Sequence, residues 1–448
     1  MALLKTWRRY FVTKIKCTCI LKTQCLPRLI SFVFVIGQEY TLGMLIRKAY
    51  NFRLKPHAEQ RQQMINYSGA CRFLWNKVLK LNLDRIDNKQ GLLWYHEADH
   101  WSKLWKASDE YGFLKEAPAH CLQQKLKDLT KAFKDGFDKQ QPLKRLPKFK
   151  KRGMGDSFRF PEPKQIVLDN RRIKLPKLGW IRFFKSRPIE GKIKNATISM
   201  KAGHWYVALQ VELELPEPCN LPKSVLGVDM GISQFAACSD GRLISPKNSF
   251  RSFEVALGKL QKQLARKVRF SQNWKKVKAR IQKLHSKIAH SRHDFLHKLS
   301  TQLSKNHAML VVEDLKINNM SRSAKGDLEN PGKQVKAKSG LNKSILDQGW
   351  GEFRRQLDYK LKCLGGVLLK VDPKYTSQRC HACGHTSKAN RQTQAKFCCQ
   401  SCGHEENADI NAAKNILAAG HAVLACGEDT LVTSMKQELL GIGDLVPA

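Results

Sequence analysis

The sequence has no long hydrophobic run. In 448 residues, no uninterrupted apolar stretch approaches the roughly 18 residues that a membrane-spanning helix requires. The longest such stretch near the start, residues 29–36, follows four basic residues, but it is short, contains Ser31 and precedes no clear cleavage pattern. We therefore expect neither a membrane anchor nor a signal peptide, and no membrane partner.

Acidic residues are scarce. Only 38 aspartates and glutamates stand against 80 lysines and arginines, which leaves a formal net charge of +42. The basic excess is spread along the chain, whereas a basic amphipathic membrane protein would concentrate it on one helix beside an apolar stripe. A compact protein with this much self-repulsion needs a polyanionic partner, and the composition favours nucleic acid.

The sequence also lacks the cysteine pattern of a disulfide framework. Most of the 14 cysteines are single and lie among apolar residues, where reduced cysteine behaves as a small hydrophobic residue. The exception is the pair of CxxC motifs formed by Cys380, Cys383, Cys399 and Cys402, with fifteen residues between them. Four thiolates fill a tetrahedron, so this spacing predicts one structural zinc ion. The alternatives are a set of unligated cysteines in a loop, or Cys398 as a ligand in place of Cys399.

The first half of the sequence is predicted to contain both strands and helices. Tyr50, Phe52 and Leu54 alternate with polar residues, as in a half-buried strand that ends at Pro56. Helical periodicity follows, and short alternating runs from 156 to 214 predict a small sheet or barrel that the opening strand could complete. We predict an N-terminal extension (1–43), a β-domain (44–56 and 148–220) and an inserted helical module (57–147).

The second half alternates buried strands with long helices, which is typical of an α/β domain. Two basic helices are predicted between residues 257 and 288, and residues 348–364 predict a third helix. The polar stretch 321–340 is predicted to be a mobile loop before that helix. We assign the α/β domain to 221–375 and 404–424, the zinc ribbon to 376–403 and a C-terminal tail to 425–448.

Three carboxylates stand at the ends of these elements. Asp229 follows the apolar strand VLGV, Glu313 follows AMLVV, and Asp409 precedes an apolar helix, so all three can meet at one edge of a sheet. Oxygen ligands at three separated points are what a pair of Mg²⁺ ions needs for phosphodiester hydrolysis. Taken singly, each acid is more often a turn former or a solvated side chain. Asp314 competes with Glu313, but side chains alternate along a strand and only one faces the site.

Several segments together resemble a known family. From about Met44 to Ala419 the chain resembles the OrfB/TnpB proteins of bacterial insertion sequences, and the matching motifs occur in order: KAYNFRLKP, SGACRFLWN, GVDMGISQFAACSDG, VVEDL, LNKSILDQGWGEFRRQLDYK, VDPKYTSQRCHACGH and CCQSCGHEENADINAAKNIL. The resemblance implies a multidomain α+β fold in which a wedge-type β-barrel carries the helical recognition module. It further implies an RNase H-like (RuvC) nuclease domain interrupted by the ribbon. Asp229, Glu313 and Asp409 match the three RuvC acids, and the four cysteines match the ribbon ligands.

The same resemblance implies RNA-guided cleavage of double-stranded DNA beside a short flanking motif, with a noncoding RNA of the element as guide. The expected location is the bacterial cytoplasm at the nucleoid, as a monomer with RNA. Basic residues between the helical module and the strands are predicted to contact phosphates: Lys144, Arg145, Lys148, Lys150, Lys151 and Arg152. Tyr95 is a candidate for contact with the flanking motif, although an aromatic residue on a helix is more often part of the core.

Two alternative functions fit some of these residues. A transposase-type strand transferase can also use three acids on an RNase H-like fold, but the ribbon directly before the third acid argues against it. A nuclease-inactive, RNA-guided repressor would bind the same partners. The presence of all three acids argues against that alternative without proving catalysis.

Overall fold

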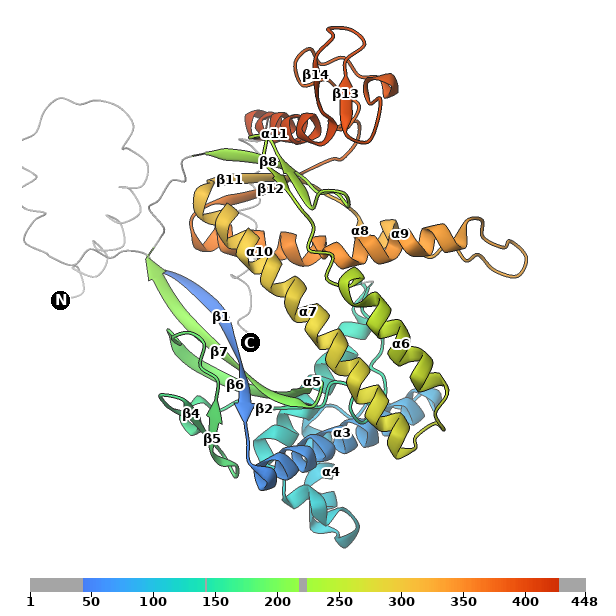
Figure 1. Cartoon of the computed structure of the whole chain (residues 1–448). Coiled ribbons are helices and arrows are strands. Elements are labelled where there is room, and N and C mark those ends of the chain that lie inside the picture. The colour runs from blue at the N-terminus through green and yellow to red at the C-terminus, as the bar shows by residue number, and fades with distance from the viewer. Residues whose placement is uncertain (1–42, 142, 217–223, 427–448) are drawn as a thin grey trace, which may run out of the picture. The chain divides into compact units, whose positions relative to one another are not determined.

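The computed structural model describes residues 43–141, 143–216 and 224–426. The predicted extension up to residue 42 and the predicted tail from 427 onwards lie outside these residues. The described helices include none that combines the length and the apolar character needed to cross a membrane. The chain is a multidomain protein of mixed α and β structure, as predicted (Figure 1).

A seven-stranded sheet joins the start of the described chain to residues far along it. The first strand, β1, lies between β7 and β5, and its Leu54 pairs with Phe183 in an antiparallel register. The order across the sheet is β2 (Ser157–Phe160), β6 (Lys192–Lys201), β7 (His204–Pro216), β1 (Gly43–Lys55), β5 (Gly179–Phe183), β4 (Arg172–Leu175) and β3 (Val167–Asp169). The alternation in the sequence correctly predicted that the opening strand completes this sheet.

Helices occupy the segment between β1 and β2. They are α3 (Ala58–Asp87), α4 (Tyr95–Ala107), the short 3-10 helix η2 (Asp109–Lys115) and α5 (Ala119–Phe137). The buried face of α3 includes Met64 and Leu74, and that of α5 includes Leu122 and Phe133. These side chains share one core with Phe158 and the other inward-facing residues of the sheet, which explains the three-to-four spacing of apolar residues.

A second sheet of five strands carries the candidate site. Its order is β10 (Leu243–Ile244), β9 (Ala236–Cys238), β8 (Val225–Asp229), β11 (Met309–Glu313) and β12 (Val367–Val371). The strands β8, β11 and β12 are parallel, and every residue of β11 is buried. Parallel strands covered on both faces require continuous apolar runs, which is why VLGV and MLVV do not alternate.

Long helices follow these strands. They are α6 (Glu254–Ala265), α7 (Gln272–Asn306), the short α8 (Ile317–Met320), α9 (Val335–Gln348) and α10 (Trp350–Cys363), preceded by the 3-10 turn η4 (Arg251–Phe253). The prediction of a loop over 321–340 was wrong for its last six residues, because α9 begins at Val335. Ile345 of α9 is buried in the core, and Gly349, with φ of +73°, ends α9 directly before α10. Tertiary packing therefore stabilises a helix whose first turns are polar.

The cysteine-rich segment forms a small unit beside the last helix. It contains the 3-10 turn η5 (Lys388–Asn390) and the hairpin of β13 (Lys396–Cys398) and β14 (Glu405–Asn407), and α11 (Ala408–Cys426) follows at once. Figure 1 shows this hairpin next to α11, and α11 lying against β8. The fold thereby joins the ribbon directly to the helix that carries Asp409.

Candidate functional site

The strand register brings two of the predicted acids to the same sheet edge. Val312 of β11 is the partner of Val228 of β8, so the next residues, Glu313 and Asp229, end the two parallel strands side by side. Asp409 reaches the same place from the first turn of α11. The first and the last of the three residues are 180 positions apart in sequence, and the sheet with its covering helix brings all three together.

The charges of these acids interact. The pKa of Asp229 is raised from 3.8 to about 7, first by burial, then by the negative charges of Glu313 and Asp409. Arg391 and the backbone N–H of Met230 act in the opposite direction on Asp229. Burial also raises the pKa of Glu313. A site of crowded, partly desolvated carboxylates is electrostatically suited to bind cations.

Glu313 is held from one side by a hydroxyl. Thr376 donates a hydrogen bond of 2.6 Å from Oγ1 to Oε1 of Glu313, which is 8 % exposed. The neighbouring Asp314 points away and accepts a 2.8 Å hydrogen bond from Arg354 at the surface. The alternation along β11 thus leaves Glu313, and not Asp314, on the side of Asp229.

Asp409 is positioned by the helix start. The side chain of Asn407 accepts hydrogen bonds from the backbone N–H groups of Asp409 and Ile410, at 3.0 and 3.3 Å, so it caps α11. A carboxylate in the first turn is favoured by the positive end of the helix dipole. Arg391, from the ribbon, donates a 2.9 Å hydrogen bond to Oδ1 of Asp409. The ribbon therefore contributes a side chain to the acid cluster.

Two glycines allow α11 to lie close to the strands. A Cβ at Gly227 of β8 would lie 2.2 Å from the backbone oxygen of Ala413 in α11. At the other end of the helix, a Cβ at Gly420 would lie 2.5 Å from Val311 of β11. Both positions leave no room for a side chain, so the depth at which Asp409 sits depends on them.

Two asparagines one turn apart on α11 fasten the loop that carries Thr376. Asn415 donates hydrogen bonds to the backbone oxygens of Thr376 (2.9 Å) and Arg379 (2.6 Å). Asn411 donates to Arg379 at 2.8 Å and accepts from the backbone N–H of His381 at 3.0 Å. The sequence analysis did not identify Thr376, Arg391 or these asparagines. The i, i+4 spacing of Asn411 and Asn415 in an otherwise apolar helix was the available signal.

The four predicted cysteines form one cluster. Their sulfur atoms all lie within 4.8 Å of one another, and the pairs Cys380–Cys402 and Cys383–Cys399 are 3.8 and 3.6 Å apart. A tetrahedral ion with Zn–S bonds of about 2.3 Å places its sulfurs roughly 3.8 Å apart, so the cluster fits a metal ion such as zinc. Backbone N–H groups, first that of Cys402, lower the pKa of Cys399 to about 6 and favour the thiolate that such an ion binds.

The three acids are arranged differently from the cysteines. In the described part of the chain, two groups have ligand atoms that all lie within 4.8 Å: the four cysteines, and His381 with His404 and Glu406. Asp229, Glu313 and Asp409 are not such a group, so their oxygens do not converge on one point. A pair of cations about 4 Å apart does not need ligands that converge on one point.

The basic connector before β2 is attached to α3. The indole N–H of Trp75 donates to the backbone oxygen of Lys148 at 3.1 Å, and Asn76 makes two hydrogen bonds with the backbone of Lys150. Nζ of Lys150 lies 3.6 Å from the centre of the Trp75 ring. Burial, followed by the charge of Lys125, lowers the pKa of Lys150 to about 8. This lysine is half-buried, whereas the other five predicted basic residues are exposed: Lys144, Arg145, Lys148, Lys151 and Arg152.

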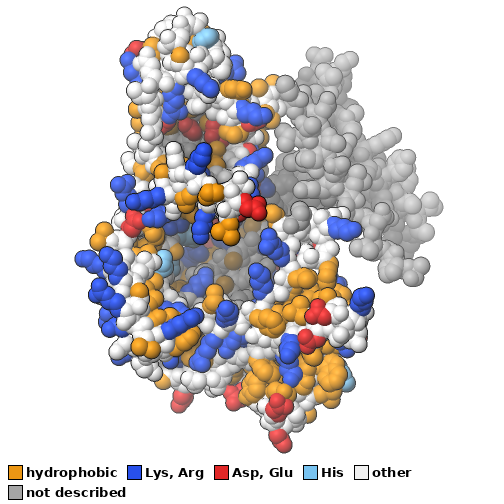
Figure 2. Space-filling view, turned by 90° about the vertical axis from the view of Figure 1, so that its right-hand side faces the viewer, with side chains coloured by type: hydrophobic (Ala, Val, Ile, Leu, Met, Phe, Trp, Pro, Cys, Tyr) orange, Lys and Arg blue, Asp and Glu red, His pale blue; other side chains and the backbone are white. Residues whose placement is uncertain are grey.

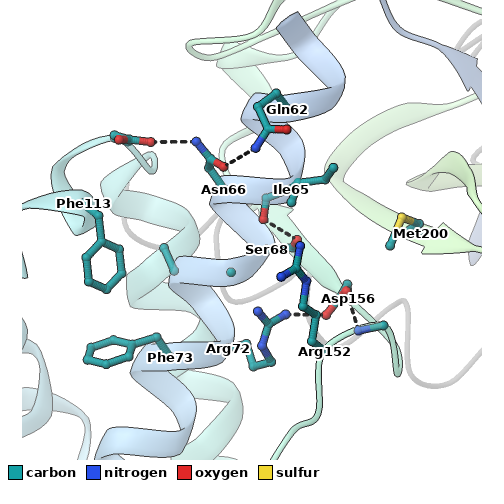
Figure 3. A pocket seen from close by; sticks show the side chains of 14 residues that line it. Gln62, Ile65, Asn66, Ser68, Arg72, Phe73, Phe113, Arg152, Asp156 and Met200 are labelled. Carbon is teal, nitrogen blue, oxygen red and sulfur yellow. Dashed lines mark hydrogen bonds and ion pairs between the residues drawn. The ribbon is translucent and has the colours of Figure 1, made fainter. Parts of the chain in front are cut away.

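Arg152 faces a cavity of about 600 Å³ between α3 and the loop before β2 (Figure 3). Arg72 also lines it and donates a 2.8 Å hydrogen bond to the buried Asp156. Gln62 and Asn66 add polar groups from the same face of α3. Two guanidinium groups, of Arg72 and Arg152, and two carboxylates, of Glu116 and Asp156, thus line this cavity.

Tyr95 is the first residue of α4 and is partly buried against the core of the helices. Nζ of Lys127 lies 4.9 Å from the centre of its ring. Much of the Tyr95 side chain therefore belongs to the core, which is the alternative to contact with the flanking motif. Lysine and arginine side chains are spread over the coloured, described part of the face shown in Figure 2, where acidic side chains are fewer.

The fold and the site define a multidomain α+β protein with an acidic sheet edge and, next to it, a four-cysteine cluster that fits a metal ion. Three family models match the chain. Residues 208–324 match a model described as a probable transposase, OrfB of IS605, and this range includes Asp229 and Glu313. Residues 350–416, with the cysteines and Asp409, match the TNB domain of Cas12f1-like proteins. Residues 44–91 match a helix-turn-helix domain of OrfB of IS605.

Known relatives match most of the chain. The protein of Escherichia coli K12 named "Putative RNA-guided DNA endonuclease InsQ" is 50 % identical over 381 residues, which cover 85 % of this chain and 94 % of that protein. A protein of Streptomyces pristinaespiralis, also named as an RNA-guided DNA endonuclease, is 29 % identical and covers 86 % of this chain and 92 % of its own length. The chain belongs to the OrfB/TnpB family of insertion-sequence proteins.

A comparison with solved structures finds a mini-RNA-guided endonuclease, CRISPR-Casφ3, with a TM-score of 0.47 and 11 % identity. The match covers 86 % of this chain and 94 % of that one. The family assignment is based on the sequence relatives alone.

Proposed function

We propose that this protein is an RNA-guided DNA endonuclease of a bacterial insertion sequence, and that Asp229, Glu313 and Asp409 are its catalytic carboxylates. The observation that carries this proposal is that the three acids meet at one sheet edge, where burial first, and then the charges of Glu313 and Asp409, raise the pKa of Asp229 to about 7. Repulsion and desolvation make a cluster of carboxylates unfavourable unless a cation neutralises its charge. Carboxylates with pKa values perturbed in this way are typical of active sites. The names of the relatives supply the substrate class.

In this proposal the acids hold divalent cations, and two Mg²⁺ ions are the expected cofactor. When bound, such ions activate a water molecule and stabilise the leaving oxygen of a phosphodiester. Thr376 orients Glu313, and the capped start of α11 orients Asp409. Arg391 neutralises part of the charge on Asp409, so the cluster retains its shape at neutral pH.

The remaining parts have separate roles. The seven-stranded sheet forms the wedge-type β-barrel (44–56 and 148–220), and α3 to α5 form the recognition module within it (57–147). The parts 221–375 and 404–424 form the RuvC-like domain, interrupted by the ribbon (376–403). A noncoding guide RNA and double-stranded DNA are the partners, and exposed basic residues such as Lys148, Lys151 and Arg152 contact their phosphates.

The zinc ion has a structural role in this proposal. Four cysteines complete the coordination of zinc, so no position remains for a reacting water molecule. The ion instead fixes the loop that holds Arg391 against Asp409. The repressor alternative does not require intact acids, and the strand-transferase alternative requires acids but no ribbon directly before the third one.

The test is cleavage by the protein assembled with the transcript of its own element. Asp229→Ala should abolish magnesium-dependent cleavage of a DNA target that matches the guide, while binding of RNA and DNA is retained, because the acid holds cations and not the duplex. Electrophoretic cleavage and binding assays measure the two effects separately. A variant that still cleaves at the wild-type rate would exclude Asp229 from catalysis.

The matched control is Asp314→Ala. Asp314 is adjacent to Glu313 in sequence but is exposed and paired with Arg354, so its loss should leave cleavage unchanged. If wild-type protein joins transposon ends in the absence of RNA, the strand-transferase function is correct. If it binds its guide and target but never cuts, the repressor function is correct.

A further inference from the structure

The turn between α6 and α7 carries two neighbouring aromatic residues that the proposed catalysis does not use, the exposed Phe270 and the partly buried Trp274. Figure 1 shows the two helices side by side, and residues 266–271 connect them. Phe270 is 62 % exposed and its neighbour in the turn, Val268, is 79 % exposed. Exposed apolar side chains at one turn are the kind of surface that a soluble protein uses for contact with a partner.

The backbone at Phe270 adopts a conformation that disfavours this residue. The N–H of Ser271 donates to the oxygen of Val268 at 3.1 Å, which makes Phe270 the third residue of a β-turn. Its φ is +68°, and turns with a positive φ at this position normally carry glycine or asparagine. A bulky side chain in the left-handed region is strained, and such strain is characteristic of functional positions.

The strained turn holds Phe270 beside a second ring. The ring centres of Phe270 and Trp274 are 5.5 Å apart, and the rings are tilted by 59°. Ser271 caps α7 by accepting a hydrogen bond from the backbone N–H of Trp274 at 3.1 Å, which fixes the first turn of the helix. The guanidinium carbon of Arg269 lies 5.0 Å from the Phe270 ring, and Nζ of Lys278 lies 4.7 Å from the Trp274 ring.

The surrounding charge is of one sign. Between Val255 and His293 the sequence contains twelve lysines and arginines and no acidic residue. Aromatic side chains among cations fit single-stranded nucleic acid, because cations bind the phosphates and rings stack on the bases. An apolar protein partner would gain little from so much positive charge, and a duplex has no free base face to offer.

We propose that Phe270 and Trp274 stack on an unpaired base of the bound guide RNA. This inference depends on the proposed function for the identity of the RNA. The guide is the better occupant than the displaced DNA strand, because it stays bound between cleavage events and keeps the apolar turn covered. Arg269 and Lys278 then contact the phosphates on either side of the stacked base.

The test compares Phe270→Gly with the wild type in the full-length protein. Glycine removes the ring and accepts the positive φ, so the RNA-free variant should melt at the same temperature as the wild type or higher. Its affinity for the guide RNA should fall about tenfold, as expected for the loss of one stacked base. Ultraviolet crosslinking of the wild-type complex, followed by mass spectrometry, should identify a peptide with Phe270 or Trp274 attached to a guide nucleotide.

Val268→Ala is the matched control, since it removes exposed apolar surface from the same turn but no ring, and its affinity should stay within twofold of the wild type. Unchanged affinity of both Phe270→Gly and Trp274→Ala overturns the inference. Crosslinks of this peptide to DNA and not to RNA overturn the choice of the guide. In both results the wild type still binds its guide and cuts, so the proposed function stands. A wild type that binds no element transcript removes both proposals.

Discussion

At the residue scale, the three acids of the cluster have different surroundings. Asp229 is partly buried and receives a hydrogen bond from the backbone N–H of Met230, Glu313 is buried and accepts a hydrogen bond from the hydroxyl of Thr376, and Asp409 is paired with Arg391. Because like charges close together cannot all ionise freely, the protein without bound cations retains a proton on Asp229 near neutral pH. A bound divalent cation would release that proton.

The pH dependence of stability follows from the raised pKa of Asp229. An unfolded aspartate has a pKa of about 3.9, so between pH 4 and 7 the folded, metal-free protein binds a proton that the unfolded chain does not. The free energy of unfolding should therefore fall as the pH rises through this range, by up to about 4 kcal/mol. Urea unfolding at a series of pH values from 5 to 8, in the presence of a magnesium chelator, measures this change in the free energy of unfolding.

Asp229→Asn is the control for that experiment, because asparagine has a similar shape and no titration. This variant should lose most of the pH dependence and be more stable than the wild type at pH 8. An equally steep loss of stability in Asp229→Asn would mean that other groups cause it.

At the scale of secondary-structure elements, the site depends on how α11 lies on β8. Gly227→Ala places a methyl group 2.2 Å from the backbone oxygen of Ala413, and neither backbone can yield without moving the helix. We expect a loss of about 1–3 kcal/mol in unfolding free energy, together with a loss of cleavage as Asp409 is displaced.

Gly258→Ala is the matched substitution, since Gly258 lies within α6 with no atom within 4 Å of the added methyl group. Alanine there should stabilise the protein by about 0.5–1 kcal/mol and leave cleavage unchanged. Urea unfolding of both variants provides the comparison. Equal stabilities would show that α11 tolerates the added methyl group.

The ribbon is the second element on which the site depends. Cys380→Ser should release the metal and unfold residues 376–407 locally, because metal binding supplies most of the folding free energy of such a small unit. Unfolding of the ribbon also removes Arg391 from Asp409. Metal analysis and limited proteolysis measure the two effects.

The adjacent cysteines provide the control for the ribbon. Cys398→Ser should retain the metal, since Cys398 is not part of the sulfur cluster, whereas Cys399→Ser should behave like Cys380→Ser. Metal loss in Cys398→Ser with retention in Cys399→Ser would reverse the assignment of the fourth ligand.

At the scale of the whole molecule, the charge of +42 dominates association with polyanions. Release of counterions from many phosphates makes such binding steeply dependent on salt. The affinity for guide RNA should fall roughly a thousandfold or more between about 50 and 200 mM monovalent salt. Filter binding at a series of salt concentrations measures the slope. A nearly flat slope would mean that few basic residues contact phosphates.

The sequence predicted most of the elements and their order. The β1 alternation, the buried runs of β8 and β11 and the helical spacing of α3 and α5 all reflect local periodicity, which a single sequence displays. The loop predicted over 321–340 was wrong beyond Val335, since the packing of Ile345 and its neighbours, and not local composition, stabilises α9. The four clustered cysteines were predictable because ligand spacing is local within each CxxC.

The sequence by itself determined which residue types are present at strand and helix ends, and hence the candidates Asp229, Glu313 and Asp409. Only the tertiary structure decided their partners, because Thr376 is brought to Glu313 by a loop and Arg391 is brought to Asp409 by the ribbon. Hydrogen bonds between distant segments depend on strand register and helix packing, and periodicity carries no information about either.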